Sequence, residues 1–246
     1  MSKRTAVVTG GIGGLGTAIC VALARAGRSV VAADLGSNPE RVARFEHEVD
    51  GLDIRFAPLD VSDFDSCGGF VGEVQARHGS LDILVNAAGI TRDTTLRKME
   101  QAQWQAVMNV NLDSVFNLCR HAVDGMSERG FGRIVNISSV NGQTGQFGQT
   151  NYSAAKAGMH GFTISLAREN AKLGITVNTV SPGYVATDMV MAVPEEVRAK
   201  IAADIPTGRL GKPEEIAYAV AFLVDEQAAW ITGSNLDING GHHMGW

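Results

Sequence analysis

Tyr152 and Lys156 stand four residues apart in the stretch NYSAAKAG, at the start of a segment predicted to be a helix over 151–173. Four residues are about one helical turn, so both side chains lie on one face of that helix. Ser139, thirteen residues before the tyrosine, ends a predicted strand. Together these groups can protonate an oxygen that gains negative charge, with the phenol as acid and the hydroxyl as hydrogen-bond donor. The spacing alone also fits an exposed polar pair.

Lys156 is expected to stabilise the phenolate of Tyr152. Lowering the pKa of a tyrosine by about three units from about 10 requires roughly 4 kcal/mol. One ammonium group about 5 Å away supplies roughly 3 kcal/mol at an effective dielectric constant of about 20. Asn111, on a helix predicted over 101–129, is an amide that could bind a water connecting Lys156 to solvent. Its alternative role is to satisfy an irregularity in that helix.

A glycine-rich loop supplies the second candidate site. The predicted strand 6–9 runs through GGIGGLG, residues 10–16, into a helix predicted over 14–26. Glycines allow close approach to a pyrophosphate, and the N–H groups and dipole of a helix start favour its negative charge. The loop therefore predicts a dinucleotide site with contacts from Gly10, Gly14, Leu15 and Gly16.

Asp34 ends the next predicted strand, about twenty residues after the loop. An acid there accepts hydrogen bonds from ribose hydroxyls and repels a 2′-phosphate, which favours NAD(H) over NADP(H). Asp34 could instead cap a helix, and Arg41 could still reach a phosphate, so NADP(H) stays possible. Asp60 with Val61, and Asn86 through Gly89, end two further strands and are predicted to border the adenine and the ribose, unless they are strand-end turns.

Alternation of short β-branched runs with longer helical patterns predicts an α/β fold: one Rossmann-like domain over 1–246, a doubly wound parallel sheet flanked by helices. The strands are expected at 6–9, 29–33, 53–59, 83–86, 133–138, 176–181 and 234–238, and the clearest helices at 14–26, 101–129, 151–173 and 213–223. The segment 184–206 reads as the least regular part and follows a strand end, so it is predicted to be a substrate lid.

The composition narrows the class of protein. A formal charge of −5 over 246 residues, without clustered Lys and Arg, argues against a nucleic-acid binder. No apolar stretch has the length of a signal peptide or a membrane span, so a cytoplasmic protein without membrane contact is expected. The three cysteines lie far apart and are expected to be buried free thiols. Adjacent His242 and His243 favour a tail at a subunit interface over a metal site.

In order and spacing, these motifs resemble the short-chain dehydrogenase/reductases over nearly the whole chain. They are Thr9-Gly10 with Gly14 and Gly16, Asn86-Ala87-Ala88-Gly89, Asn111, Ser139, Tyr152 with Lys156, and Ser181-Pro182-Gly183. The family usually has a second Asn where this chain has Ala87. The resemblance implies catalysis by Asn111, Ser139, Tyr152 and Lys156, with hydride transfer to or from a nicotinamide. It also implies that Tyr152, Lys156, Pro182, Gly183 and Val185 contact this cofactor.

Within that family, the stretches GITRDTTLRKM, GRIVNISSVNGQTGQFGQTNYSAAKAG and NGGHHMG look like bacterial acetoacetyl-CoA reductases of polyhydroxybutyrate synthesis. This similarity implies reduction of acetoacetyl-CoA to (R)-3-hydroxybutyryl-CoA by a homotetramer, with substrate contacts from Gln146, Phe147, Gln149 and Tyr184. Those enzymes generally use NADPH, a pattern from which Asp34 departs. Amides at 146 and 149 would be left unpaired in an apolar tunnel, which argues against a long-chain substrate.

Three alternatives stay open. A reductase of 3-oxoacyl groups on acyl carrier protein would use the same pantetheine arm. An NAD-dependent 3-hydroxybutyrate dehydrogenase would suit Asp34. A dinucleotide-binding regulator without turnover would not need the set Asn111, Ser139, Tyr152 and Lys156, so the intact set disfavours it.

Overall fold

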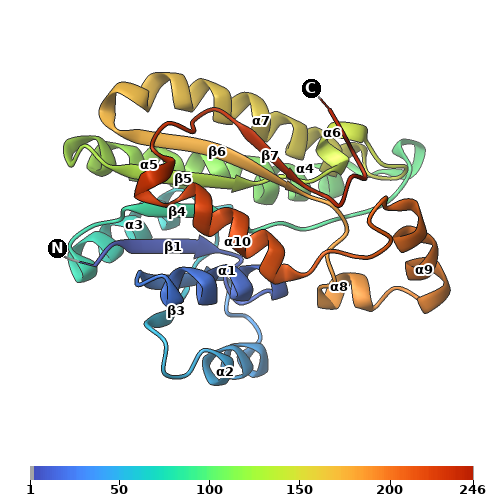
Figure 1. The fold of residues 1–246 in the computed structure, drawn as a ribbon, viewed down its shortest axis with the longest axis horizontal. Coiled ribbons are helices and arrows are strands. Elements are labelled where there is room, and N and C mark those ends of the chain that lie inside the picture. Colours follow the sequence, from blue (N-terminus) through green and yellow to red (C-terminus); the bar gives the residue numbers. More distant parts are fainter. Residues whose placement is uncertain (1–2, 246) are drawn as a thin grey trace.

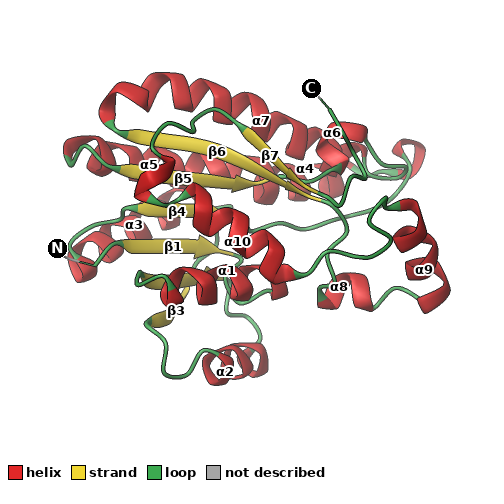
Figure 2. Cartoon of the chain, viewed as in Figure 1, coloured by secondary structure: helices red, strands yellow, loops and turns green. Residues whose placement is uncertain are grey.

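Seven short apolar segments form one parallel sheet in the computed structural model, which describes residues 3–245 (Figures 1 and 2). They are β1 (Thr5–Thr9), β2 (Ser29–Asp34), β3 (Ile54–Pro58), β4 (Ile83–Asn86), β5 (Gly132–Ile137), β6 (Ile175–Pro182) and β7 (Asn235–Ile238). All seven predicted strands are confirmed, with ends that differ from the predicted ones by at most one residue. Met1, Ser2 and Trp246, at the ends of the predicted domain, lie outside the described residues.

The strand order is β3-β2-β1-β4-β5-β6-β7, and every neighbouring pair is parallel. The chain therefore builds outward from β1 in one direction and then from β4 in the other. This reversal between β1 and β4 is the topological switch point at which open α/β sheets bind ligands, beyond the carboxyl ends of the strands. In Figure 1 these ends point toward α6, α8 and α9.

Helices cover both faces of the sheet, as predicted. On one face α1 (Gly14–Arg25), α2 (Pro39–Glu48) and α10 (Pro213–Leu223) contribute to a core that includes Val8 of β1. On the other face α3 (Phe64–His78), α5 (Ser114–Glu128) and α7 (Thr150–Asn170) pack over Val7. Consecutive residues of a strand point to opposite faces of the sheet. Because helices cover both faces, Val7 and Val8 are both buried, in different cores.

The helix predicted over 101–129 is divided into three parts. They are α4 (Gln101–Met108), the π-helical turn η2 (Asn109–Asp113) and α5. Further short elements are η1 (Leu96–Lys98), α6 (Asn141–Thr144), η3 (Ala171–Leu173) and η4 (Glu226–Ala228). The continuous apolar periodicity of this region hides the π-helical turn, which lies where the chain passes the carboxyl ends of the strands.

The segment 184–206 is more regular than predicted, because it contains α8 (Asp188–Met191) and α9 (Glu195–Asp204). The first-turn acids Glu195 and Glu196 favour the start of α9, since negative charge stabilises a helix N-terminus. The ends of the segment are fixed to the body: Tyr184 O accepts from Gly211 N at 2.9 Å, and Thr207 N donates to Gly240 O at 3.2 Å. Its role as a substrate lid stays a prediction.

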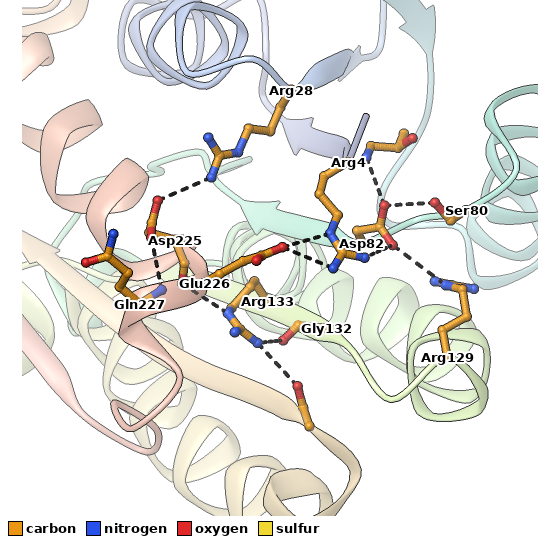
Figure 3. Close-up of polar contacts among 12 residues, drawn as sticks. Arg4, Arg28, Ser80, Asp82, Arg129, Gly132, Arg133, Asp225, Glu226 and Gln227 are labelled. Carbon is orange, nitrogen blue, oxygen red and sulfur yellow. Dashed lines mark hydrogen bonds and ion pairs between the residues drawn. The ribbon is translucent and has the colours of Figure 1, made fainter. Parts of the chain in front are cut away.

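The opposite, amino-terminal edge of the sheet is held by a charged network (Figure 3). The buried carboxylate of Asp82 accepts from Thr5 N at 3.0 Å and from the Ser80 hydroxyl at 2.8 Å. Arg4 and Arg129 each approach it to 3.7 Å. These contacts tie the start of β1 to the start of β4, far from the carboxyl ends where the candidate site lies.

Candidate active site

The glycine loop between β1 and α1 is shaped to receive an anion. Gly10 has a φ of +63°, and Gly13 N donates to its oxygen at 3.0 Å. A Cβ on Gly16 would overlap the same oxygen, whereas a Cβ on Gly14 would meet only Thr187, at 3.6 Å. Within the described residues, the main-chain N–H groups of Gly14, Leu15 and Gly16 have no acceptor. Three free donors at a helix start fit the pyrophosphate of a dinucleotide.

Asp34 lies at the end of β2, beside this loop, as predicted. One carboxylate oxygen accepts from Leu35 N at 2.9 Å, and the other lies 3.8 Å from the Arg41 guanidinium. Arg41 also donates to Ile12 O in the glycine loop at 3.2 Å. Asp34, predicted to bind the ribose, and Arg41, the alternative phosphate ligand, are therefore neighbours. Their ion pair reduces the negative charge that Asp34 presents to a ribose.

Asp60 and Val61, which follow β3, differ in where their polar atoms are bonded. Asp60 accepts from the main chain and hydroxyl of Ser62, at 2.9 and 2.6 Å, and so supports the turn after β3, which is its alternative role. Val61 is buried, and its oxygen accepts from Asn117 at 3.0 Å.

The side chain of Asn86 does not face the predicted cofactor site. It is buried and donates to Asn136 at 2.8 Å, because β4 and β5 pair in register at these two residues. Only the backbone of Asn86 remains for a ribose contact. The next residues, Ala87 and Ala88, donate to the Thr9 hydroxyl at 3.0 and 3.1 Å, which fixes this loop against the end of β1.

Asn111 lies in the π-helical turn, and its amide is almost fully occupied. Its nitrogen donates to Ile90 O and Val107 O, both at 2.9 Å, and its oxygen accepts from Ile90 N at 3.1 Å. Both N–H groups are used, but the oxygen keeps one lone pair for a water, so the predicted water contact stays a prediction. The alternative role, satisfying a helix irregularity, is what the hydrogen bonds show.

Gly89 lies between Asn111 and Lys156. A Cβ at Gly89 would lie 2.6 Å from the oxygen of the Asn111 side chain and 3.6 Å from Lys156 Nζ. The π-helical turn, the loop after β4 and the start of α7 therefore converge on one residue that has no room for a side chain. The sequence predicted that the segment containing Gly89 borders a ribose of the cofactor.

Tyr152 and Lys156 lie one turn apart at the start of α7, and Nζ is 5.6 Å from the centre of the tyrosine ring. Lys156 is buried and donates to Ile137 O, at the end of β5, at 2.7 Å. Ser139 follows that strand and accepts from Asn141 N at 3.1 Å through its hydroxyl oxygen. The three predicted groups are thus brought together at the carboxyl edge of the sheet.

Burial has the largest effect on the pKa of Tyr152. Burial raises the pKa of Tyr152, the Ser139 hydroxyl lowers it and the charge of Asp93 raises it again. Burial also lowers the pKa of Lys156 to about 8. In the chain alone, desolvation therefore exceeds the favourable contacts at Tyr152. A lowered pKa, which needs the charges of both Lys156 and a bound oxidised nicotinamide, stays a prediction.

The predicted substrate contacts are divided between exposed and anchored side chains. Gln146 is exposed, and 87% of Phe147 is exposed. Gln149 is half-buried; it accepts from Asn141 at 2.9 Å and donates to Asp93 at 2.8 Å. Gln146 is solvated, and the Gln149 amide is largely paired. The expected penalty beside an apolar chain is therefore limited to the one N–H and one lone pair of Gln149 that remain.

Asp93 was not predicted as a site residue. It lies in the loop after β4, accepts a hydrogen bond from Gln149 and raises the pKa values of Tyr152 and Tyr184. An acid in the loop after a strand of a parallel sheet was the available signal.

The remaining predicted cofactor contacts line the turn after β6. Pro182 ends β6, Gly183 N donates to Ile238 O at 3.0 Å, and Val185 is buried. Two residues further, Thr187 lies beside Gly14 of the glycine loop. The turn therefore borders the loop that is predicted to hold the dinucleotide.

No group of three or more His, Cys, Asp or Glu side chains suited to a metal ion occurs in residues 3–245. The three cysteines are buried free thiols, as predicted. Among the described helices, none is both long enough and apolar enough to cross a membrane. Within the chain, the ring of His242 stacks on Tyr184, and its predicted place at a subunit interface stays a prediction.

Comparison with known proteins agrees with this geometry. The family model described as enoyl-(acyl carrier protein) reductase matches residues 10–243. Acetoacetyl-CoA reductase of Allochromatium vinosum is 56% identical and covers 98% of this chain and 99% of its own. Acetoacetyl-CoA reductase of Cupriavidus necator is 53% identical over the full length of both.

This chain is also similar to a reductase named for a second class of substrate and to a protein of solved structure. The 3-oxoacyl-[acyl-carrier-protein] reductase of Escherichia coli is 44% identical over 98% of each chain. The crystal structure of gox2181 superimposes with a TM-score of 0.93 at 33% identity, over 98% of this chain and 96% of that one. The chain therefore belongs to the short-chain dehydrogenase/reductase family and is an oxidoreductase that acts on CH–OH groups.

Proposed function

We propose that this chain reduces acetoacetyl-CoA to (R)-3-hydroxybutyryl-CoA. The observation that carries the proposal is the convergence of Ser139, Tyr152 and Lys156 beside the glycine loop, in a chain whose relatives named acetoacetyl-CoA reductase match it end to end. The relatives indicate the substrate class, and the convergence supplies groups suited to ketone reduction.

The residues divide the chemistry as follows. A reduced nicotinamide held beside Tyr152 and Lys156 would supply the hydride that converts the substrate ketone to an alkoxide. Ser139 donates a hydrogen bond to that oxygen, and Tyr152 donates the proton. Lys156, held by Ile137 O, binds the ribose and stabilises the phenolate as it forms. Asn111 fixes the loop after β4 through Ile90 and so keeps this part of the site in place.

The cofactor we propose is NAD(H). Asp34 stands at the end of β2, where an acid suits two free ribose hydroxyls. Arg41 compensates part of its charge at 3.8 Å, so NADP(H) is expected to bind more weakly and is not excluded by repulsion alone. The glycine loop contributes equally to both cofactors, because it contacts only the pyrophosphate.

A short polar acyl thioester suits the substrate side. Gln149 is oriented by Asn141 and Asp93, and one amide hydrogen and one lone pair remain for the second carbonyl of a 3-oxoacyl group. Exposed Phe147 and Gln146 stand on the same loop, where a pantetheine arm would pass. A long alkyl chain against Gln149 would leave this remaining N–H and lone pair without partners, which disfavours such a substrate.

We propose further that the chain acts in the cytoplasm as a homotetramer. Trp230 is 98% exposed, and Tyr218 and Phe222 on α10 are also exposed. Large apolar side chains exposed to solvent favour burial against another copy. Sedimentation or light scattering of the purified protein gives the subunit number directly.

The substrate is tested by comparing kcat/KM for acetoacetyl-CoA, an acetoacetyl-acyl-carrier-protein and free acetoacetate with the same reduced cofactor. A preference for acetoacetyl-CoA of about tenfold or more supports the proposal. The second candidate is the acyl-carrier-protein reductase, which the 44%-identical relative favours. A higher kcat/KM for the protein-bound substrate would assign that activity instead, and a preference for free acetoacetate would indicate a 3-hydroxybutyrate dehydrogenase.

A further inference from the structure

The C-terminal turn, residues 239–244, contacts both ends of the segment 184–206. At its first end, Tyr184 stacks on His242, and a Cβ on the preceding Gly183 would lie 2.9 Å from Asn239 Cα. After its last residue, Thr207 N donates to Gly240 O at 3.2 Å, and a Cβ on Gly241 would lie 3.2 Å from Pro206. Figure 1 shows the C-terminal end of the chain on the same side of the sheet as α6, α8 and α9. One short turn therefore contacts both ends of the predicted lid.

The turn itself is fixed by Asn239, whose side chain is buried. Its amide oxygen accepts from Gly241 N at 2.9 Å, and its amide nitrogen donates to His243 O at 3.0 Å. Its main-chain oxygen accepts from His242 N at 3.2 Å. His242 thus projects from a backbone whose position is set by three hydrogen bonds.

The imidazole of His242 stacks on the ring of Tyr184, with 5.7 Å between ring centres and 26° between ring planes. The backbone of Tyr184 is held by Gly211, so its ring orientation depends on side-chain packing. Burial and the charge of Asp93 raise the pKa of Tyr184, which keeps the phenol neutral beside the site. Tyr184 is the one predicted substrate contact on the lid side of the site.

The hydrogen-bonding groups of His242 do not explain its position. Its Nδ1 is buried and has no hydrogen-bond partner among the described residues. A buried nitrogen without a partner destabilises, so the ring is held by stacking and packing. An aromatic ring without this nitrogen should therefore replace it.

We propose that His242 is a positioning residue that orients Tyr184 toward the acyl arm of the substrate. The inference rests on the proposed function, because it takes Tyr184 as a substrate contact. His242 acts on Tyr184 and not on Tyr152, the proposed proton donor. Its effect is expected in the KM for the substrate, with kcat and cofactor affinity unchanged.

The experiment compares His242→Ala with His242→Phe and with the control His243→Ala on the same turn. KM and kcat are measured with whichever 3-oxoacyl substrate the wild type reduces fastest, together with NADH affinity and Tm. This choice separates failure of the inference from failure of the substrate proposal. If the alanine variant does not fold, His242→Leu replaces it, since leucine keeps volume without an aromatic ring.

His242→Ala is expected to raise KM about 3- to 10-fold, the range of one aromatic pair, with kcat within about twofold. His242→Phe and His243→Ala should match the wild type, and NADH affinity should not change in any variant. The double variant with Tyr184→Ala should add nothing to Tyr184→Ala alone. An unchanged KM in His242→Ala, or equal impairment in His242→Phe, would overturn the proposal.

Discussion

Lys156 Nζ donates to Ile137 O at 2.7 Å and lies 5.6 Å from the centre of the Tyr152 ring. The strand end thus holds the ammonium one helical turn from the phenol, in a buried position that lowers the pKa of the lysine to about 8. Proton donation by Tyr152 is favoured while Lys156 carries its charge. Lys156 therefore loses its proton, and with it its charge, as the pH rises through about 8.

The first prediction concerns pH. Because the pKa of Lys156 is about 8, the fraction of charged ammonium falls as pH rises through about 8, and the rate of ketone reduction should fall with it. Lys156→Arg keeps the charge and should move this falling limb to higher pH. Initial rates from about pH 6 to about pH 10 measure both profiles. If the rate falls at the same pH in the arginine variant as in the wild type, a group other than Lys156 causes the fall.

The second prediction concerns the cofactor. In the wild type, the Arg41 guanidinium lies 3.8 Å from the Asp34 carboxylate. Asp34→Ala removes that carboxylate and leaves Arg41 free to bind a 2′-phosphate. The ratio of kcat/KM for NADPH over NADH should rise by about tenfold or more, or about 1.4 kcal/mol. Arg41→Ala is the matched variant and should lower the same ratio. Equal ratios in all three proteins would show that neither residue selects the cofactor.

The glycine loop gives a third prediction, with an internal control. A Cβ on Gly16 would overlap Gly10 O, a backbone atom that cannot move aside, whereas a Cβ on Gly14 makes ordinary contact with Thr187. Gly16→Ala should abolish dinucleotide binding or lower the free energy of unfolding by about 1–3 kcal/mol. Gly14→Ala should keep its Tm. NADH titration and thermal unfolding of the two variants, run side by side, would contradict this if they behaved alike.

Stability at the opposite edge of the sheet depends on Asp82. This buried carboxylate satisfies Thr5 N and Ser80 and neutralises Arg4 and Arg129 (Figure 3). Asp82→Ala leaves a buried N–H without a partner and should cost about 3–5 kcal/mol in chemical denaturation. Glu226→Ala, which frees only the exposed end of Arg4, should cost less than about 1 kcal/mol. A similar loss in both variants would show that burial is not the cause.

Much of the fold was predictable because its signals are local. The seven strands are short β-branched runs between turns, and alternation with helices defines a parallel sheet. The position of Tyr152 and Lys156 follows from helical spacing alone. The glycine loop, Asp34 and the turn after β6 meet at the carboxyl edge because parallel strands all end there.

Other features depend on contacts between distant residues. The π-helical turn around Asn111 is fixed by Ile90, about twenty residues earlier, so apolar periodicity cannot reveal it. Asn86 turns toward Asn136 because β4 pairs with β5 in one register. The raised pKa of Tyr152 results from burial by surrounding elements. Asp93 and His242 act through partners 56 and 58 residues away in the chain, Gln149 and Tyr184.

The assignment of Tyr152 as proton donor in acetoacetyl-CoA reduction is tested by one comparison: kcat for acetoacetyl-CoA reduction with NADH in the wild type and in Tyr152→Phe. Phenylalanine keeps the ring beside Lys156 and removes only the acid, so NADH affinity should stay within about twofold. The wild type should turn over and the variant should lose about a thousandfold in kcat. A variant that retains more than about a tenth of wild-type kcat would contradict this assignment.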